Sequence, residues 1–231
     1  MAEPAQDLNG KAPDRRGFSF VLRQNNDEPD QRLELHARHH PRFGPVFTDW
    51  LSAEMYRRVA AGKRQLLARA VGLNKRASLR VLDATGGLGR DAWTLAALGA
   101  DVTLAERNET LFTLLQDGHR RAVLIEPEIA QRLLLVRADA HVLLQQSWDV
   151  VHLDPMFPHA GKTALPQKEL QILRELCGDD TDADSLLAPA LAAARRVAVK
   201  RPLSAPALAN RKPRATLKGT QMRYDIYLAS P

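Results

Sequence analysis

The chain has 231 residues, of which 45% are hydrophobic and 26% are charged, and this composition excludes collagen-like, coiled-coil and wholly disordered proteins. Cys177 is the single cysteine, so an internal disulfide and a cysteine-based zinc site are excluded, and a cytoplasmic location is expected. No apolar stretch is long enough to cross a membrane, and the first residues lack the apolar segment of a signal peptide.

The net charge of +6 is distributed unevenly along the chain. Residues 1–78 carry +5 and residues 195–231 carry +8, whereas residues 79–194 carry −7. Two interpretations remain open. Either the charges are ordinary solvated surface, or the basic flanks converge on a phosphate backbone while the acidic middle carries out chemistry.

Residues 1–17 are polar and contain two prolines and two glycines, which predicts a flexible lead-in. Residues 18–77 are expected to form a small α+β subdomain of three short strands and a helix that Gly62 can break. These predicted elements are strands 18–23, 32–36 and 44–48 and helix 49–71.

From residue 78 onward, strands alternate with helices, which predicts a parallel sheet covered on both faces. The predicted strands are 78–85, 101–106, 132–139, 148–154 and 195–201. The predicted helices are 90–99, 108–124, 141–146, 164–176 and one beginning at Asp184 or Ser185. Segments 215–219 and 223–229 predict a terminal hairpin, so residues 78–231 form the second domain.

A glycine-rich loop follows the first strand of this domain. The strand ends at Asp83, and the next residues read A-T-G-G-L-G-R-D before a helix begins. Gly87 and Gly89 let the backbone approach a ligand at the helix N-terminus, on the sheet edge where α/β proteins bind ligands. Thr85 stands in the first glycine position of D-x-G-x-G-x-G, a pattern that favours S-adenosylmethionine over a dinucleotide.

Acidic residues end the next two strands. Glu106 can accept hydrogen bonds from both hydroxyls of a ribose, or it is a solvated strand-end acid. Arg107 is placed to pack beside the adenosine. For Asp139 two roles remain open, an acceptor for the adenine amino group and a cap for helix 141–146.

The fourth strand runs into D-P-M-F-P-H, which is similar to the (D/N/S)-P-P-(Y/F) loop of methyltransferases that act on planar amines. The Asp154 carboxylate and the Pro155 carbonyl would accept the two N–H bonds of such an amine, and Phe157 would stack on the base. Met156 replaces the usual second proline. The alternative is a turn with a core phenylalanine.

Four basic side chains follow the fourth and fifth strands. His159 and Lys162 either contact substrate phosphate or are solvated, and Lys200 and Arg201 are expected to contact nucleic acid. The histidines at 36, 39 and 40 have no carboxylate or cysteine beside them in a fixed pattern, so no metal site is expected.

In this order and spacing, DATGGLGRDAW, LAERN, VVHLDPMFPH, KRP and RYDIY resemble the ribosomal RNA small subunit methyltransferase J family, over about residues 44–229. The chain departs from that family at Asp139 and Ala140, where the family has two serines. The resemblance implies cofactor contacts at Arg90, Asp91, Glu106, Arg107, Asp139, Ala140 and Asp154.

The resemblance also implies a fold and a reaction. The expected fold is the Rossmann-like, seven-stranded class I α/β fold of S-adenosylmethionine-dependent methyltransferases, with a small N-terminal α+β extension. The expected reaction is methyl transfer to the exocyclic N2 of a guanine in 16S rRNA, free or within the small ribosomal subunit. Alternatives are an amine methyltransferase of DNA or tRNA, an inactive RNA-binding relative and a dinucleotide oxidoreductase.

Overall fold

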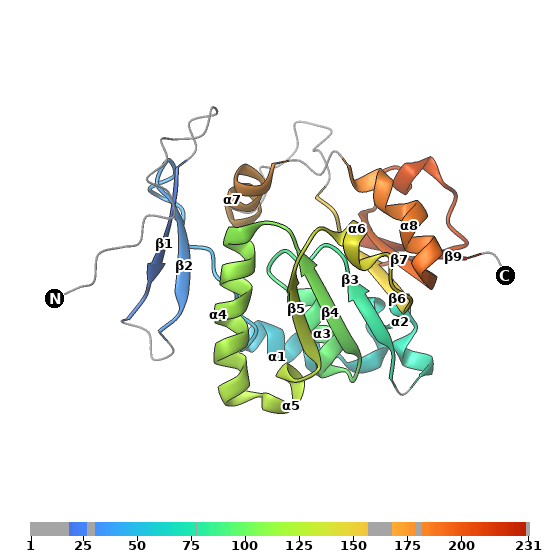
Figure 1. Cartoon of the computed structure of the whole chain (residues 1–231), viewed down its shortest axis with the longest axis horizontal. Helices are drawn as coiled ribbons and strands as arrows, with labels where there is room; N and C mark the ends of the chain where they lie inside the picture. The colour runs from blue at the N-terminus through green and yellow to red at the C-terminus, as the bar shows by residue number, and fades with distance from the viewer. Residues whose placement is uncertain (1–18, 27–30, 77, 157–167, 179–181, 230–231) are drawn as a thin grey trace.

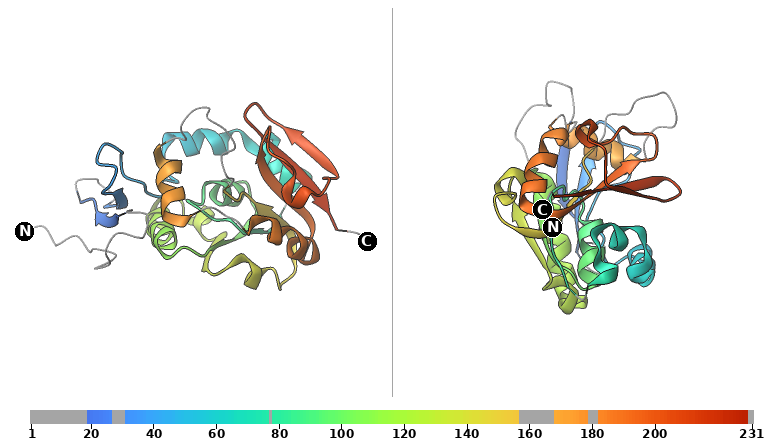
Figure 2. Two further views of the ribbon diagram at one scale, coloured as in Figure 1. Left: turned by 90° about the horizontal axis from the view of Figure 1, so that it is seen from above. Right: turned by 90° about the vertical axis from the view of Figure 1, so that its right-hand side faces the viewer.

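The computed structural model describes residues 19–26, 31–76, 78–156, 168–178 and 182–229. A central twisted sheet carries helices on its faces, and a separate two-stranded hairpin lies beside α4 and α7 (Figure 1). Figure 2 shows that this hairpin and the C-terminal strands lie at opposite ends of the molecule. Phe157, His159 and Lys162 lie outside the described residues.

The strands are β1 (Phe20–Gln24), β2 (Leu33–Ala37), β3 (Arg80–Asp83), β4 (Asp101–Glu106), β5 (Leu133–Arg137), β6 (Trp148–Leu153), β7 (Ala194–Pro202), β8 (Ala215–Lys218) and β9 (Met222–Leu228). The α-helices are α1 (Ala53–Ala60), α2 (Leu66–Val71), α3 (Arg90–Ala97), α4 (Glu109–Ile125), α5 (Pro127–Ala130), α6 (Ala140–Leu143), α7 (Lys168–Cys177) and α8 (Leu187–Ala193). The 3-10 helices are η1 (Gly62–Arg64), η2 (Leu73–Lys75), η3 (Ala183–Leu186) and η4 (Leu208–Asn210).

The main sheet has seven strands in the order β5-β4-β3-β6-β7-β9-β8. The strands from β3 to β7 pair in parallel, and β9 is antiparallel to both β7 and β8. This confirms the predicted seven-stranded α/β fold and its terminal hairpin. The strand order reverses between β3 and β6, and ligands bind outside the carboxyl ends of the strands at such a point.

Successive residues of the central strands point to opposite faces of the sheet, and each face has its own core. Val81 and Val150 pack with residues of α1, α2 and α3. Leu82 and Val151 pack with residues of α6 and α8 on the other face. Helices α1 and α2 therefore belong to the core of the sheet, whereas the hairpin packs in a separate cluster with α7 and part of α4. The division of the chain at residue 77 remains a prediction.

The β1–β2 hairpin is attached by an apolar cluster that it forms with α4 and α7, and by polar contacts. His39 Nε2 and His40 Nε2 each lie 2.9 Å from a carboxylate oxygen of Glu175 on α7. A carboxylate therefore lies beside these histidines in the fold, although none accompanies them in a fixed pattern in the sequence, and the absence of a metal site stays a prediction. Sequence inspection missed Glu175 because it lies 135 residues beyond His40.

Two predicted elements differ from the structure. Residues 44–48 form no strand, and Val46 makes one isolated bridge with Leu35. The helix predicted over 49–71 begins at Ala53, where Ser52 caps it, and is interrupted at Gly62, whose φ is +66°. Within the described residues, no helix combines the length and apolar character needed to span a membrane.

The two basic flanks of the sequence meet only in part. Helix α2 packs beside β7, β8 and β9, so it brings the N-terminal flank to the C-terminal one. The β1–β2 hairpin lies at the far end of the molecule (Figures 1 and 2).

Candidate active site

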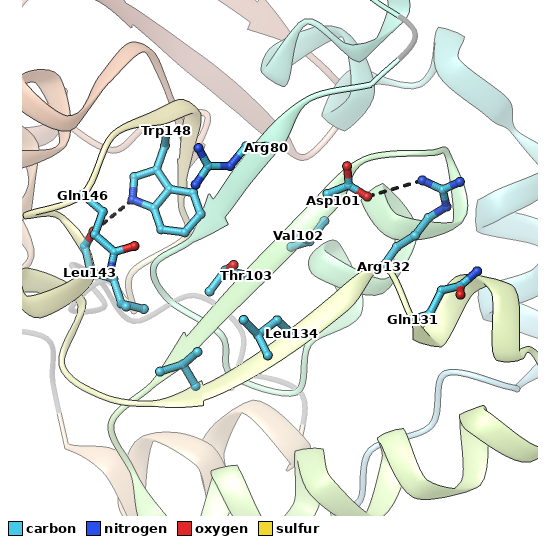
Figure 3. Close-up of a pocket in the computed structure, with 11 residues that line it drawn as sticks. Arg80, Asp101, Val102, Thr103, Gln131, Arg132, Leu134, Leu143, Gln146 and Trp148 are labelled. Atoms are coloured by element: carbon cyan, nitrogen blue, oxygen red, sulfur yellow. Dashed lines mark hydrogen bonds and ion pairs between the residues drawn. The ribbon is translucent and has the colours of Figure 1, made fainter.

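A cavity of about 340 Å³ opens at the carboxyl ends of the parallel strands. Residues from the loops after β3, β4, β5 and β6 line it, together with residues of α7 and η3. A second cavity of about 400 Å³ lies over β3, β4 and β5 and includes Arg80, Asp101 and Arg132 from the amino ends of these strands (Figure 3). The first cavity is the candidate site, because the loops predicted to carry the chemistry converge there.

The glycine loop after β3 is fixed by packing on one side and open to the cavity on the other. Gly87 lines the cavity with a φ of +54°, and a Cβ there would meet nothing within 4 Å. Gly89 has a φ of +72° and faces inward, where a Cβ would lie 2.7 Å from the Trp50 ring. Trp50 Nε1 donates to the Leu88 carbonyl at 2.9 Å. Gly87 therefore has the place of a ligand contact, and Gly89 has a packing role.

Glu106 joins the loops that follow β3 and β4. Its carboxylate accepts hydrogen bonds from the backbone N–H of Gly87 at 2.9 Å and from that of Asn108 at 2.7 Å. The residue lines the cavity although only 8% of its surface is exposed. Each carboxylate oxygen has two lone pairs, so Glu106 retains capacity to accept from the hydroxyls of a ligand.

Asp139 lines the cavity and also caps α6, where it accepts a hydrogen bond from the backbone N–H of His141 at 2.9 Å. This bond is the main reason that the pKa of Asp139 lies below its ordinary value. Arg107 lines the same cavity and bonds Asp182 at 2.7 Å. The capping role of Asp139 is confirmed, and its contact with adenine remains a prediction.

The loop after β6 brings Asp154 and Met156 to the cavity, while Pro155 is buried beside them. The backbone N–H of Asp154 donates to Thr85 Oγ1 at 2.6 Å, so the two predicted loops are in direct contact. Burial raises the pKa of Asp154 above its ordinary value; Lys200 opposes this rise and Asp91 adds to it.

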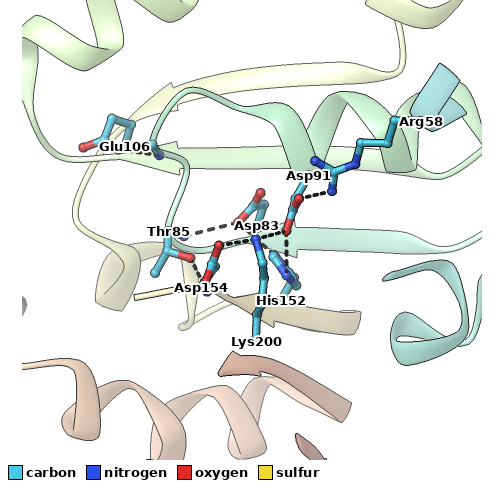
Figure 4. A network of polar contacts seen from close by, with 9 residues as sticks. Arg58, Asp83, Thr85, Asp91, Glu106, His152, Asp154 and Lys200 are labelled. Carbon is cyan, nitrogen blue, oxygen red and sulfur yellow. Dashed lines mark hydrogen bonds and ion pairs between the residues drawn. The ribbon is translucent and has the colours of Figure 1, made fainter. Parts of the chain in front are cut away.

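A chain of alternating charges runs from Asp154 away from the cavity (Figure 4). Lys200 Nζ lies 2.7 Å from Asp154 Oδ2 and 3.3 Å from Asp91 Oδ2. Arg58 of α1 donates to the other oxygen of Asp91. Burial alone would raise the pKa of Asp91, but Lys200 and Arg58 hold it well below its ordinary value.

His152 lies beneath this chain and is fully buried on β6. Its Nδ1 is 3.3 Å from Asp83 Oδ1, and its Nε2 is 3.5 Å from Asp91 Oδ2. Burial alone would lower the pKa of His152, but the charges of Asp83 and Asp91 raise it above its ordinary value. The imidazole therefore lies between two carboxylates that belong to separate elements, Asp83 of β3 and Asp91 of α3.

The cavity brings together six residues of the predicted site, namely Gly87, Glu106, Arg107, Asp139, Ala140 and Asp154. Three other predicted residues do not line the cavity. Asp83 contacts His152, and Asp91 and Lys200 belong to the chain of alternating charges that begins at Asp154. Arg90 makes a two-point ion pair with Glu169 of α7 at 2.7 and 2.8 Å. Arg201 is 4% exposed and donates to the Pro206 carbonyl at 2.9 Å, so its guanidinium is not placed for the predicted contact with nucleic acid.

Sequence reasoning missed three residues of the site. The hydroxyl of Thr85 was not given a role, although its place in a glycine position was the available signal. His152 precedes the D-P-M-F loop within a buried strand, and Arg58 belongs to a helix distant in sequence. His152 and Arg58 belong to no local sequence motif. The tertiary packing of β6 and α1 places them beside Asp91 of α3.

Comparison with known proteins agrees with this geometry. The profile of a family described as "Putative SAM-dependent methyltransferase" matches residues 11–229. A Marinobacter nauticus protein named ribosomal RNA small subunit methyltransferase J is 50% identical over 194 residues, covering 80% of this chain and 70% of its own. An Aliivibrio fischeri protein of the same name is 44% identical over 228 residues, covering 91% of this chain and 86% of its own length. The crystal structure of a SAM-dependent methyltransferase from Neisseria gonorrhoeae matches with a TM-score of 0.67 and 32% identity. The match covers 87% of this chain and 80% of that one.

The sheet order and the loops that meet at its switch point define a Rossmann-like methyltransferase that uses S-adenosylmethionine. Within this class, the chain belongs to the ribosomal RNA small subunit methyltransferase J family.

The cavity fits S-adenosylmethionine in size and in chemistry. A volume of about 340 Å³ suits a ligand of this kind, and Ala84, Ala105 and Leu186 give apolar walls for a flat ring. The Glu106 carboxylate would accept from the ribose hydroxyls, and Gly87 leaves room for close approach of a ligand to the backbone. Bound S-adenosylmethionine supplies a methyl group activated by a sulfonium.

Proposed function

We propose that this enzyme transfers a methyl group to the exocyclic N2 of a guanine in 16S rRNA. The observation that carries the proposal is the position of Asp154, which lines one cavity together with Gly87 and Glu106. Lys200 holds Asp154 Oδ2, and among the described residues Oδ1 has no hydrogen-bond partner. The names of the relatives from Marinobacter nauticus and Aliivibrio fischeri support rRNA as the substrate.

The proposed chemistry explains why a carboxylate stands at this point. The lone pair of an exocyclic amine is delocalised into the ring, so the amine is a poor nucleophile. A hydrogen bond from one amine N–H to Asp154 Oδ1, and a second to the Pro155 carbonyl, would orient the nitrogen and favour its pyramidal form. As the N–C bond forms, the S–C bond to the methyl group would break and leave its electron pair on sulfur. The positive charge that develops on nitrogen would be stabilised by the nearby carboxylate, and one amine proton would then pass to this carboxylate or to solvent.

An exposed basic segment supports a polyanionic substrate. Arg211, Lys212, Arg214 and Lys218 are exposed, and within the described part of the chain they make no ion pair. The segment follows η4, where the backbone N–H of Ala209 donates to Asp184 of η3 at 2.7 Å. Because η3 lines the cavity, the start of this segment lies near one wall of the cavity. Lys218 pairs with Arg223 opposite Arg201, at the carboxyl end of β7, where a phosphate of a bound RNA would have a cation to contact. We place the reaction in the cytoplasm, with 16S rRNA or the small ribosomal subunit as partner.

The test is methyl transfer from labelled S-adenosylmethionine to four substrates: small ribosomal subunits, naked 16S rRNA, tRNA and DNA. We expect label in 16S rRNA, as free RNA or in subunits, and mass mapping should place it on guanine N2. Cells without the protein should lack that modification. Label confined to DNA or tRNA would reject the proposed substrate, and absence of S-adenosylmethionine binding by calorimetry would indicate an inactive RNA-binding relative.

A further inference from the structure

Lys200 is enclosed by carboxylates at the end of β7. Its ammonium lies 2.7 Å from Asp154 and 3.3 Å from Asp91, and the side chain is 20% exposed. Burial would lower the pKa of Lys200, but the two carboxylates raise it above its ordinary value, so the ammonium stays charged. A lysine held by two carboxylates is poorly available to RNA phosphates. This arrangement differs from the RNA contact that the sequence predicted for it.

Asp91 holds the other side of the ammonium. Its side chain is 9% exposed and lies between Lys200, Arg58 and His152. A buried carboxylate needs such partners because removing its charge from water is costly. Asp91 also does not line the cavity, so its side chain is placed to fix Lys200 rather than a cofactor.

We propose that Lys200 is a positioning residue that holds Asp154 ionised and turned so that Oδ1 is left for the substrate amine. This inference rests on the proposed function, because it assigns Lys200 a part in orienting the same amine. Asp91 holds Lys200 in place, and Arg58 of α1 in turn holds Asp91 (Figure 4).

Lys200 changes the pKa of Asp154 in a definite direction. Burial and the Asp91 charge favour the protonated form of Asp154, and protonation turns one carboxylate oxygen into a hydroxyl donor and removes the negative charge. Lys200 opposes both effects at a distance of 2.7 Å. Without Lys200, the pKa of Asp154 rises, and the enzyme needs a higher pH to reach the same ionised fraction.

The experiment measures kcat and KM for RNA from pH 6 to pH 9.5 in the full-length wild type, Lys200→Met and Lys200→Arg. For Lys200→Met we expect kcat at pH 7 to fall by about tenfold or more, with KM changed by less than about threefold. The acid limb of the kcat profile should move upward by about one to three pH units. Lys200→Arg keeps the positive charge, so its acid limb should remain near that of the wild type.

Lys212→Met is the matched control, because it removes an exposed lysine of the basic segment. We expect it to raise KM for RNA and to leave the pH profile of kcat unchanged. The inference is overturned if Lys200→Met behaves in the same way, since that result would identify Lys200 as a phosphate contact. It is also overturned if kcat falls by the same factor at every pH.

Two further measurements keep the inference testable if Lys200→Met does not fold or if rRNA is not the substrate. Asp91→Asn should lower kcat while the Kd for S-adenosylmethionine stays within about threefold, whereas a weakened Kd with unchanged kcat would overturn the inference. The carboxyl carbon of Asp154, assigned by NMR with Asp154→Asn, should titrate at higher pH in any folded Lys200→Met than in the wild type, and at lower pH in Asp91→Asn, which removes a neighbouring negative charge. This titration needs no substrate, so it separates failure of the inference from failure of the proposed function.

Discussion

The backbone N–H of Asp154 donates to Oγ1 of Thr85 at 2.6 Å. This hydrogen bond connects the loop after β3, which lines the cavity, with the loop after β6, which is proposed to present the substrate amine. The threonine occupies a position where the motif has glycine, and its hydroxyl gives it a role that glycine lacks. The relative position of the two loops therefore depends in part on one side chain.

Thr85→Val should loosen this connection while keeping the shape of the side chain. We expect the free energy of unfolding to fall by about 0.5–1.5 kcal/mol, since the Asp154 N–H loses its acceptor. Turnover should fall by about tenfold, because the reacting groups lose their alignment. Urea unfolding and steady-state methylation measure the two effects. Thr85→Ser keeps the hydroxyl and should resemble the wild type; equal losses in both variants would contradict the role of the hydrogen bond.

Asp154→Ala removes the carboxylate proposed to orient the amine. Turnover should fall on the order of 10²-fold or more, as is typical when a positioned catalytic group is lost. The affinity for S-adenosylmethionine should change far less, because Glu106 and the glycine loop remain. Single-turnover kinetics and calorimetry separate the two quantities. If turnover stays within a few-fold of the wild type, Asp154 does not orient the amine.

Glu106→Ala is expected to act on the cofactor. Loss of charge-assisted hydrogen bonds to the ribose should weaken S-adenosylmethionine binding by about 1–3 kcal/mol. Part of the loss will come from the Gly87 N–H, which also bonds this carboxylate. Calorimetry measures the affinity, and Glu109→Ala is the control, because Glu109 is an acid of the same segment that pairs with Arg137 at 2.9 Å. Unchanged affinity in Glu106→Ala would reject the ribose contact.

The sheet could be predicted from the sequence because its signals are local. Buried runs such as residues 148–153 alternate with helical patterns, and loops rich in glycine or proline separate them. Helix α5 was missed, since its four residues are too short to show helical periodicity. The strand expected at 44–48 is absent for another reason. Its apolar residues fit a strand, but among the described residues its pairing is limited to a single bridge from Val46 to Leu35.

The part of the candidate site that lies at the ends of strands could be predicted from the sequence. Glu106 and Asp154 lie at the cavity because carboxyl ends of parallel strands share one edge. The interaction partner of a long basic side chain could not be predicted in the same way. Lys200 and Arg201 are neighbours in sequence, yet one binds Asp154 and the other binds the Pro206 carbonyl. Those partners are set by tertiary packing, which no local pattern encodes.

Gly89 and Gly62 form a matched pair for separating backbone strain from steric overlap. Both have positive φ, at +72° and +66°, but only at Gly89 would a Cβ meet neighbours, with Trp50 at 2.7 Å. Gly62→Ala should cost about 1–2 kcal/mol of stability through backbone strain alone. Gly89→Ala should cost about 1–3 kcal/mol more through overpacking, and it should also weaken cofactor binding by displacing the loop. Urea unfolding of both variants checks this; equal losses would contradict the packing role of Gly89.

His152 should make the stability of the enzyme depend on pH above neutrality. Burial disfavours the charged imidazole, but Asp83 and Asp91 outweigh burial and raise the pKa of His152 above its ordinary value of 6.5. A raised pKa means that the folded state binds the proton more tightly than the unfolded state does. The stabilisation is therefore complete below about pH 6.5, the pKa of an unfolded histidine, and is lost as pH rises through the folded pKa.

The measurement is the free energy of unfolding in urea between pH 6 and pH 9, in the wild type and in His152→Gln. We expect the wild type to lose more stability than the variant over this range, because glutamine keeps polar contacts but does not titrate. His119→Gln is the control, since His119 is a histidine of α4 that lies 3.1 Å from the Ala130 carbonyl. If wild type and His152→Gln show the same slope with pH, the pKa of His152 is the same in the folded and unfolded states, which would contradict stabilisation of the charged imidazole by Asp83 and Asp91.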